Sequence, residues 1–179
     1  PKDHPGKELI RQIVQLSRDP ELAKRLVFLE DYEMHVAREL VRKLVPYQFT
    51  ARLYLVPFEE IQREIVGRAP ETYRLLLYRR MMLRIAEQLA HRDHALALIA
   101  GDSLGQVASQ TAENLRAVLA AATLPVYQPL IGSDKAEIVA LARRIGTYDV
   151  SIRPHDDCCS FLNAPNPETK ASPERLAHL

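Results

Sequence analysis

The stretch that decides the fold class is ALALIAGDSLGQVASQ, residues 95–110. Its first six residues are continuously apolar, which predicts a parallel strand covered on both faces. Gly101 then opens a polar loop, and the apolar spacing from Leu104 to Val118 predicts a helix. Parallel α/β sheets bind ligands outside the carboxyl ends of their strands, so the loop after this strand is a predicted ligand site.

The same alternation of apolar runs and helical stripes extends in both directions. Further strands are predicted from short apolar runs, at 26–29, 53–56 and, more weakly, 125–127. Further helices are predicted from apolar residues three or four apart, at 9–14, 36–44, 61–66, 75–89 and 138–145. Gly146 fits the position just after the last of these helices. The pattern predicts an α/β domain with a parallel sheet flanked by helices, and a loop-like tail after about residue 150.

Composition excludes several classes of protein. The 179 residues are 47% hydrophobic and carry a formal net charge of +1, so a globular core is expected and a chain-wide basic field is not. No apolar run approaches the ~18 residues of a membrane span, and we expect no membrane contact. Two cysteines in one dipeptide exclude a disulfide framework, and the six histidines lack metal-ligand spacing. A reducing cytoplasm is the expected location, and no metal site is predicted.

The loop that starts at Gly101 offers the clearest site chemistry. A glycine lets a ligand approach the backbone closely, and a following helix N-terminus presents free N–H groups. Gln106 and Gln110 are four residues apart, so both amides are expected on one helix face. The alternative is an ordinary strand–helix turn capped by Asp102 or Ser103.

Three other places carry cations or thiols. Arg79 or Arg80 could hold a phosphate or stack on a base, although a solvated helix face is the simpler interpretation. Lys135 is expected in the first turn of a helix that Ser133 or Asp134 caps. The helix dipole disfavours a cation there, so a bound anion would explain the lysine. The alternative is that the lysine is simply solvated.

Cys158 and Cys159 form the third place and follow two aspartates in a polar segment. There a thiol could form a persulfide or a disulfide, although the carboxylates disfavour the thiolate. The alternative is a buried, inert pair.

From about residue 42 onward the sequence resembles the tRNA 4-thiouridine synthetases, also called tRNA sulfurtransferases, which also serve thiamine biosynthesis. The motifs that carry the resemblance are at 53–58, 79–82, 101–111, 129–131, 134–135, 145–148 and 157–159. The block from Gly101 is highly specific. The resemblance implies a Rossmann-like PP-loop ATP pyrophosphatase domain.

The activity implied by the resemblance is ATP-dependent sulfur transfer, with Mg²⁺ accompanying the ATP. Uridine 8 of tRNA is adenylated at a uracil carbonyl, and persulfide sulfur charged by a cysteine desulfurase then displaces AMP. Carried over by position, Arg79, Gly101 and Gln110 correspond to ATP contacts. Lys135 corresponds to the lysine that assists adenylation, and Cys158 to the cysteine that meets the persulfide.

Residues 1–42 instead resemble the carboxyl-terminal domain of α-glucan phosphorylases, most clearly at 27–32. The expected organisation is therefore a phosphorylase-like segment at 1–42, a PP-loop core at 43–155 and a Cys-Cys loop with a tail at 156–179. The family's Ser-Gly-Gly-x-Asp-Ser loop is absent, so we expect a PP-loop domain incomplete at its N-terminal side and impaired in adenylation. The family's tRNA-binding domain is expected to be absent too.

Two alternatives remain at the level of sequence. One is a non-catalytic α/β module that binds a nucleotide, a protein partner or a second copy of itself, because a missing central strand would leave sheet edges open. The other is a fragment of an α-glucan phosphorylase, although no pyridoxal-phosphate lysine is recognisable.

Overall fold

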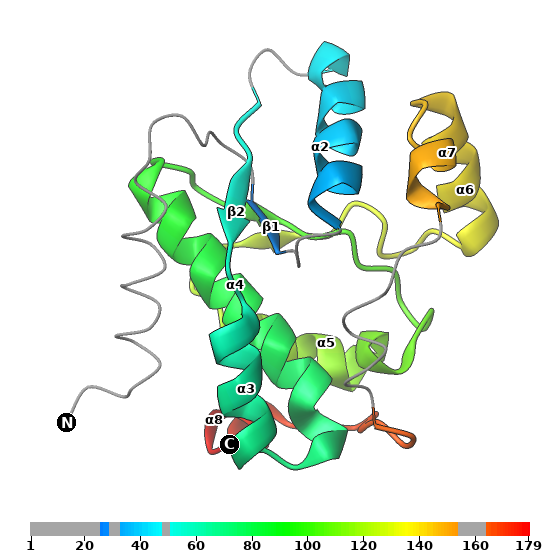
Figure 1. Ribbon diagram of the computed structural model, residues 1–179. Coiled ribbons are helices and arrows are strands. Elements are labelled where there is room, and N and C mark those ends of the chain that lie inside the picture. The colour runs from blue at the N-terminus through cyan, green and yellow to red at the C-terminus, as the bar shows by residue number, and fades with distance from the viewer. Residues whose placement is uncertain (1–25, 29–32, 48–50, 154–163) are drawn as a thin grey trace. The chain divides into compact units, whose positions relative to one another are not determined.

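The computed structural model describes residues 26–28, 33–47, 51–153 and 164–179 (Figure 1). The chain forms two compact units. The first comprises Pro1–Glu60 and Lys135–Cys158, and the second comprises Ile61–Asp134 and Cys159–Leu179. The helix predicted at 9–14 lies outside the described residues.

The first unit contains a βαβ crossover. Strand β1 (Leu26–Phe28) pairs in parallel with β2 (Tyr54–Val56), with Leu26 opposite Tyr54. Helix α2 (Glu33–Leu44) connects them and ends before η1 (Val45–Tyr47), as expected when a proline stands at position 46. The strands predicted at 26–29 and 53–56 and the helix at 36–44 are confirmed.

The second segment of this unit is a helical hairpin. Helix α6 (Lys135–Arg144) is followed by Gly146 with a φ of +75°. The Gly146 N–H donates to the Arg143 carbonyl (3.1 Å) and the Thr147 N–H to the Ala142 carbonyl (2.9 Å), a Schellman motif that confirms the predicted end. Helix α7 (Tyr148–Ser151) follows, with the Arg143 guanidinium 4.6 Å from the centre of the Tyr148 ring.

An exposed ion pair joins α2 to Arg153, two residues after α7. Arg153 Nη1 and Nη2 donate to the two carboxylate oxygens of Glu39, at 2.5 and 3.0 Å. These bonds hold the pKa of Glu39 below its ordinary value. Both side chains are exposed, so the pair orients the segments and contributes little stability.

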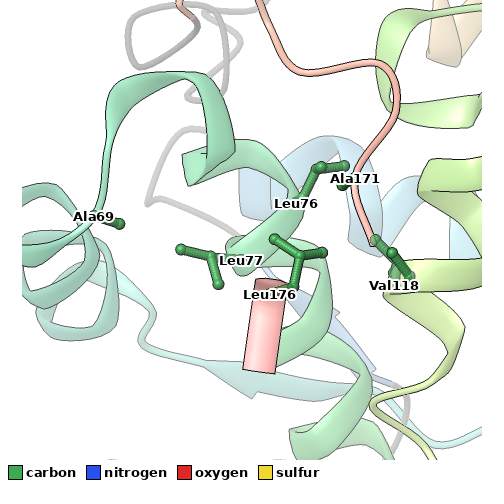
Figure 2. Close-up of a cluster of buried hydrophobic side chains, with 7 residues drawn as sticks. Ala69, Leu76, Leu77, Val118, Ala171 and Leu176 are labelled. Carbon is green, nitrogen blue, oxygen red and sulfur yellow. The ribbon is translucent and has the colours of Figure 1, made fainter. Parts of the chain in front are cut away.

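The second unit is built on the long helix α4 (Arg74–Arg92), which follows η2 (Glu71–Tyr73). Helices α3 (Glu59–Arg68), α5 (Ala112–Leu119) and α8 (Pro173–Ala177) complete its helical part. Side chains of α4, α5 and α8, with Ala69 after α3 and Ala171 before α8, form one buried cluster, in which Figure 2 shows Leu77 and Leu176 close together. Its members are Ala69, Leu76, Leu77, Ala117, Val118, Ala171 and Leu176.

The described end of the tail, residues 164–179, is more structured than expected. Ser172 caps α8 by accepting from the Arg175 N–H (3.2 Å), and Leu176 is buried at 3% exposure. Asn114, fully buried, donates through Nδ2 to the Glu168 carbonyl (2.7 Å) and accepts from the Ala171 N–H (3.0 Å). The prediction of a loop was wrong because long-range hydrogen bonds and apolar contacts, rather than local periodicity, order this segment.

The second parallel pair is β3 (Leu98–Ile99) with β4 (Val126–Tyr127). The strand predicted at 95–100 is thus present but short. The prediction that both its faces are covered was wrong, since Leu96 and Ile99 are 85% and 76% exposed. Among the described strands, β3 has β4 as its single neighbour.

Within residues 26–28, 33–47, 51–153 and 164–179, no helix is both long and apolar enough to cross a membrane.

Just after the C-terminus of α4, His94 adopts a backbone conformation that is unfavourable for a residue with a side chain. His94 has a φ of +57°, and its N–H donates to the His91 carbonyl (3.2 Å) while the Ala95 N–H donates to the Ala90 carbonyl (2.8 Å). This is a second Schellman motif, with histidine where glycine is preferred. A side chain costs about 1 kcal/mol in this left-handed region.

We therefore expect His94→Gly to raise the free energy of unfolding by about 1 kcal/mol, measured by urea denaturation. His94→Ala is the control and should give little of that gain, because alanine keeps the Cβ that is strained there. An equal gain from both substitutions would contradict the backbone origin.

Glu87 fixes α4 to the segment before β4. Its Oε1 accepts from the Thr123 N–H (2.6 Å), the Thr123 hydroxyl (2.8 Å) and the Leu124 N–H (2.6 Å). Burial disfavours the charged form of Glu87, but these bonds outweigh it and lower the pKa below the ordinary 4.5. The stabilisation is complete above the unfolded-state pKa and is lost as the pH falls through the lower folded-state value.

Glu87→Gln should lower the free energy of unfolding by about 1–3 kcal/mol at pH 7, because the charged acceptor is lost. The deficit should shrink between pH 5 and pH 3 as wild-type Glu87 becomes protonated. Urea denaturation across this range tests it, with the exposed Glu60→Gln as control. A deficit that stays constant with pH would show that the carboxylate charge is not its source.

Candidate functional site

The segment 101–110, here called the post-strand loop, is a set of turns rather than a helix. Gly105 has a φ of +74°, and its N–H donates to the Gln110 carbonyl (2.9 Å). A short 3-10 turn, η3 (Ala108–Gln110), ends the loop. Helix α5 starts only at Ala112, capped by Thr111 Oγ1, which accepts from the Asn114 N–H (3.2 Å).

Three expectations about this segment were therefore wrong. The helix does not begin near Leu104, because the positive φ of Gly105 closes a turn and Thr111 provides the better cap. Asp102 and Ser103 do not cap it. Gln106 lies outside any helix, so it does not share a helix face with Gln110.

The carboxylate of Asp102 is the centre of the site. Arg79 Nη2 from α4 and Gln110 Nε2 (3.3 Å) donate to its Oδ1. Gln128 Nε2, directly after β4, donates to its Oδ2 (3.0 Å). We call Asp102, Arg79, Gln110 and Gln128 the Asp102 cluster.

Burial and charge define how the cluster can act. Asp102 is buried at 6% exposure, and the Arg79 side chain is 20% exposed. Arg79 Nη1 also donates to the Ser109 carbonyl (2.8 Å). The guanidinium is thus held at two nitrogens and neutralised by the carboxylate, and its remaining N–H groups donate to no other described residue.

The post-strand loop is tied to the loop that follows β4. Ser103 Oγ donates to the Ser133 carbonyl (2.7 Å), and the Leu104 N–H donates to the Ile131 carbonyl (3.0 Å). Both loops follow the carboxyl ends of neighbouring parallel strands. That common edge is the place where α/β sheets bind ligands.

The two arginines of α4 have separate roles. Arg80 is buried at 5% exposure, and its Nη1 donates to the Ala117 carbonyl (2.5 Å) on α5. Burial, followed by the charge of Arg84, lowers the pKa of Arg80. Arg80 therefore joins two helices, and Arg79 is the arginine of the site.

Gly101 lies beside the cluster in an open position. It is exposed, and a Cβ added there would meet no atom within 4 Å. The structure thus gathers Arg79, Gln110 and the neighbour of Gly101 in one place. Space at this glycine leaves room for a ligand next to the backbone.

Lys135 and Cys158 are not part of this arrangement. Lys135 is exposed at the first residue of α6, in the first unit, whose placement relative to the Asp102 cluster is not defined. Cys158 and Cys159 lie outside the described residues. Within the described residues, no group of three His, Cys, Asp or Glu side chains could hold a metal ion.

Sequence reasoning missed two members of the cluster, Asp102 as its centre and Gln128. Each follows a short parallel strand directly or within three residues, Asp102 after β3 and Gln128 after β4. The shared carboxyl edge of neighbouring parallel strands was the signal that could have linked them.

Comparisons with known proteins identify relatives across most of the chain. A family model described as "Thiamine biosynthesis protein (ThiI)" matches residues 23–179. A probable tRNA sulfurtransferase of Thermus thermophilus is 58% identical over 135 residues, which are 75% of this chain and 33% of that protein. One from Anoxybacillus flavithermus is 44% identical over 138 residues, or 77% of this chain and 35% of that protein.

A solved structure is similar as well. The crystal structure of a 4-thiouridine synthetase–RNA complex with bound ATP matches with a TM-score of 0.80 and 39% identity. The match covers 86% of this chain and 42% of that one. The chain thus spans about a third of the length of the curated relatives it matches.

The expected α/β fold with a parallel sheet and flanking helices is confirmed by this structural match. The glucan phosphorylase resemblance of residues 1–42 finds no support. Residues 23–42 fall within the family match, contrary to expectation, and helix α2 crosses the suggested junction without a break. A family match over 23–179, together with these identities, shows that the chain belongs to the tRNA sulfurtransferase (4-thiouridine synthetase) family.

Proposed function

We propose that this chain is the part of a tRNA sulfurtransferase that binds ATP for the adenylation of uridine 8 in tRNA. The observation that carries the proposal is the convergence of Arg79 and Gln110 on Asp102 at the carboxyl edge of β3 and β4. Support also comes from a related protein of 39% identity whose crystal structure holds RNA and ATP.

The residues of the site suit a nucleotide. Arg79 keeps free N–H donors, and Gln110 contributes an amide within hydrogen-bond distance of the same carboxylate. Gly101 leaves open space beside them. These three residues would hold ATP together with its Mg²⁺. The bound ATP would supply the activated phosphate to which the uracil carbonyl becomes attached.

Two further residues are assigned by family position. Lys135 would assist adenylation, where its cation at a helix start would favour the developing negative charge. Cys158 would meet persulfide sulfur delivered by a cysteine desulfurase, and the sulfur would displace AMP from the activated uracil. The same sulfur transfer would serve thiamine biosynthesis.

The 179-residue chain by itself should bind nucleotide but turn over little. Its sequence contains no Ser-Gly-Gly-x-Asp-Ser segment. Such a loop stabilises a pyrophosphate leaving group through its backbone N–H groups. Without it, the activation barrier of adenylation should rise by several kcal/mol.

We expect ATP to bind the purified chain in isothermal titration calorimetry, and Arg79→Ala to weaken binding about 10- to 100-fold through loss of charge-assisted hydrogen bonds. Lys135→Ala should weaken it as well. Arg84→Ala, an exposed arginine of the same helix, is the matched control. No binding at millimolar ATP, or equal losses in all three variants, would refute the proposal.

One further variant and one activity assay extend this experiment. Gly101→Ala should preserve the melting temperature, since its Cβ meets nothing, yet lower ATP affinity if a ligand lies against that backbone. Sulfur transfer to tRNA by this chain alone, with a cysteine desulfurase and ATP, should stay near background. Normal turnover would contradict the need for the missing loop.

One observation favours a second candidate function, association with another copy of this chain. Leu96, Ile99 and Tyr127 are 85%, 76% and 61% exposed. They lie on or beside β3 and β4, and β3 pairs with no other described strand. An unpaired strand edge with exposed apolar side chains readily accepts another strand.

Light scattering after size exclusion should then give a mass above the 20.3 kDa of one chain. Ile99→Lys should return the mass to that of a monomer, because a charge disfavours edge pairing. Ile152→Lys, at an exposed isoleucine of the other unit, is the control. A monomeric wild-type chain at about 0.1 mM would exclude this candidate.

A further inference from the structure

The side chain of Asn114, the third residue of α5, is fully buried and joins two segments. Its Nδ2 donates to the Ala108 carbonyl (2.8 Å) and to the Glu168 carbonyl (2.7 Å), and its Oδ1 accepts from the Ala171 N–H (3.0 Å). Two carbonyls and one N–H as partners fix which end of the amide carries the nitrogen. The three bonds therefore require an asparagine, since a carboxylate would place an acceptor against two acceptors.

The bond to Ala108 reaches the segment that carries the site. Ala108 is the first residue of η3, and the next two residues each make a hydrogen bond within the site. The Ser109 carbonyl accepts from Arg79 Nη1 (2.8 Å). Gln110 Nε2 donates to Asp102 Oδ1 (3.3 Å). Because the peptide between Ala108 and Ser109 is planar, the bond that holds the Ala108 carbonyl also fixes the direction in which the chain enters Ser109.

The far end of η3 is attached to the same C-terminal segment. Thr111 directly follows η3, and its Oγ1 accepts from the Asn114 N–H (3.2 Å) and donates to the Thr169 carbonyl (2.7 Å). The C-terminal segment is in turn held by the Glu168 N–H, which donates to the Thr72 carbonyl (3.0 Å) in η2. η3 therefore lies between two attachments, one at each end, that both lead to the C-terminal segment.

Apolar side chains attach this C-terminal segment independently of the Asn114 amide. Ala171 and Leu176 are buried at 5% and 3% exposure in the apolar cluster. A buried amide costs free energy unless its polar atoms are bonded, so a fully bonded amide serves position more than net stability. The bond to Ala108 has no part in attaching the tail, because both of its partners lie outside the tail. What this bond determines is the geometry of η3.

We propose that Asn114 is a positioning residue for the ATP site, and that the C-terminal segment acts on this site through Asn114 and Thr111. Asn114 orients the peptide after Ala108, and this peptide directs the Ser109 carbonyl and the Gln110 amide toward their partners. ATP affinity thereby depends on contacts made 54 and 57 residues further along the chain. The inference rests on the proposed function and adds a residue that acts through the nucleotide-contacting groups.

Amide hydrogen exchange of the ligand-free chain tests the positioning role directly. In Asn114→Asp, a carboxylate oxygen faces the Ala108 carbonyl and loosens η3. The Gly105 N–H, which donates to the Gln110 carbonyl (2.9 Å), reports on this change. We expect it to exchange at least about tenfold faster in the variant, because local opening becomes easier.

Val118→Ala is the matched control for loss of stability. It empties space in the apolar cluster from the same helix and touches no bond of η3. The Gly105 N–H should therefore exchange within about twofold of the wild-type rate. Faster exchange in Asn114→Asp that is confined to the N–H groups of Glu168 and Ala171 would show that Asn114 only anchors the tail, and would overturn the inference.

Calorimetry with ATP measures the consequence for the site. We expect Asn114→Asp to weaken ATP binding about 5- to 20-fold, the effect of one to two misplaced hydrogen bonds, and Val118→Ala to bind within about twofold of the wild-type chain. Wild-type affinity in a folded Asn114→Asp would overturn the inference and leave the proposed function intact. If the wild-type chain binds no ATP, the proposed function fails, and the exchange of Gly105 still decides whether Asn114 positions η3.

A second pair of variants keeps the inference testable if Asn114→Asp does not fold. Thr111→Val removes the hydroxyl that attaches the end of η3 to Thr169, and Thr111→Ser retains it. In Thr111→Val, the Gly105 N–H should exchange at least about threefold faster and ATP should bind at least about threefold more weakly. Thr111→Ser should restore both values. Wild-type values in Thr111→Val, or equal changes in both variants, would overturn the inference.

Discussion

The carboxylate of Asp102 is the contact on which the site depends. It joins α4, the post-strand loop and the residue after β4, through partners 23, 8 and 26 residues away in the sequence. Because it is buried and can only accept, it dictates how Arg79, Gln110 and Gln128 present their remaining atoms. Loss of this acceptor would leave three donors turned toward a group that cannot satisfy them all.

At two other places in the second unit, a buried polar side chain also joins segments that are distant in the sequence. Glu87 gathers three donors from Thr123 and Leu124, and Asn114 links the start of α5 to the segment that carries α8. Such buried, satisfied polar groups fix the relative position of segments that apolar contacts alone would leave free to slide. The apolar cluster of Figure 2 then supplies non-directional stabilisation.

The family assignment and the chemistry of the Asp102 cluster together narrow the range of functions to be tested for this chain. The match covers about a third of the length of the curated relatives, and the similar solved structure is a complex with RNA and bound ATP. Within the second unit, the Asp102 cluster brings a guanidinium, a carboxylate and two amides together after the carboxyl ends of β3 and β4. For adenylation and sulfur transfer, our candidates by family position are Lys135 and Cys158.

The α/β class, the parallel strands and most of the helices could be predicted from the sequence, which also pointed to Arg79 and Gln110 as candidate site residues. Periodicity and a specific motif are local signals, so they survive without any knowledge of contacts. Three features became visible in the three-dimensional structure alone: the start of α5 at Ala112, the helix α8 near the C-terminus, and the bond by which Asp102 joins Gln128 to the site. Each of these depends on hydrogen bonds or apolar contacts between residues distant in sequence, where spacing along the chain carries no information about proximity.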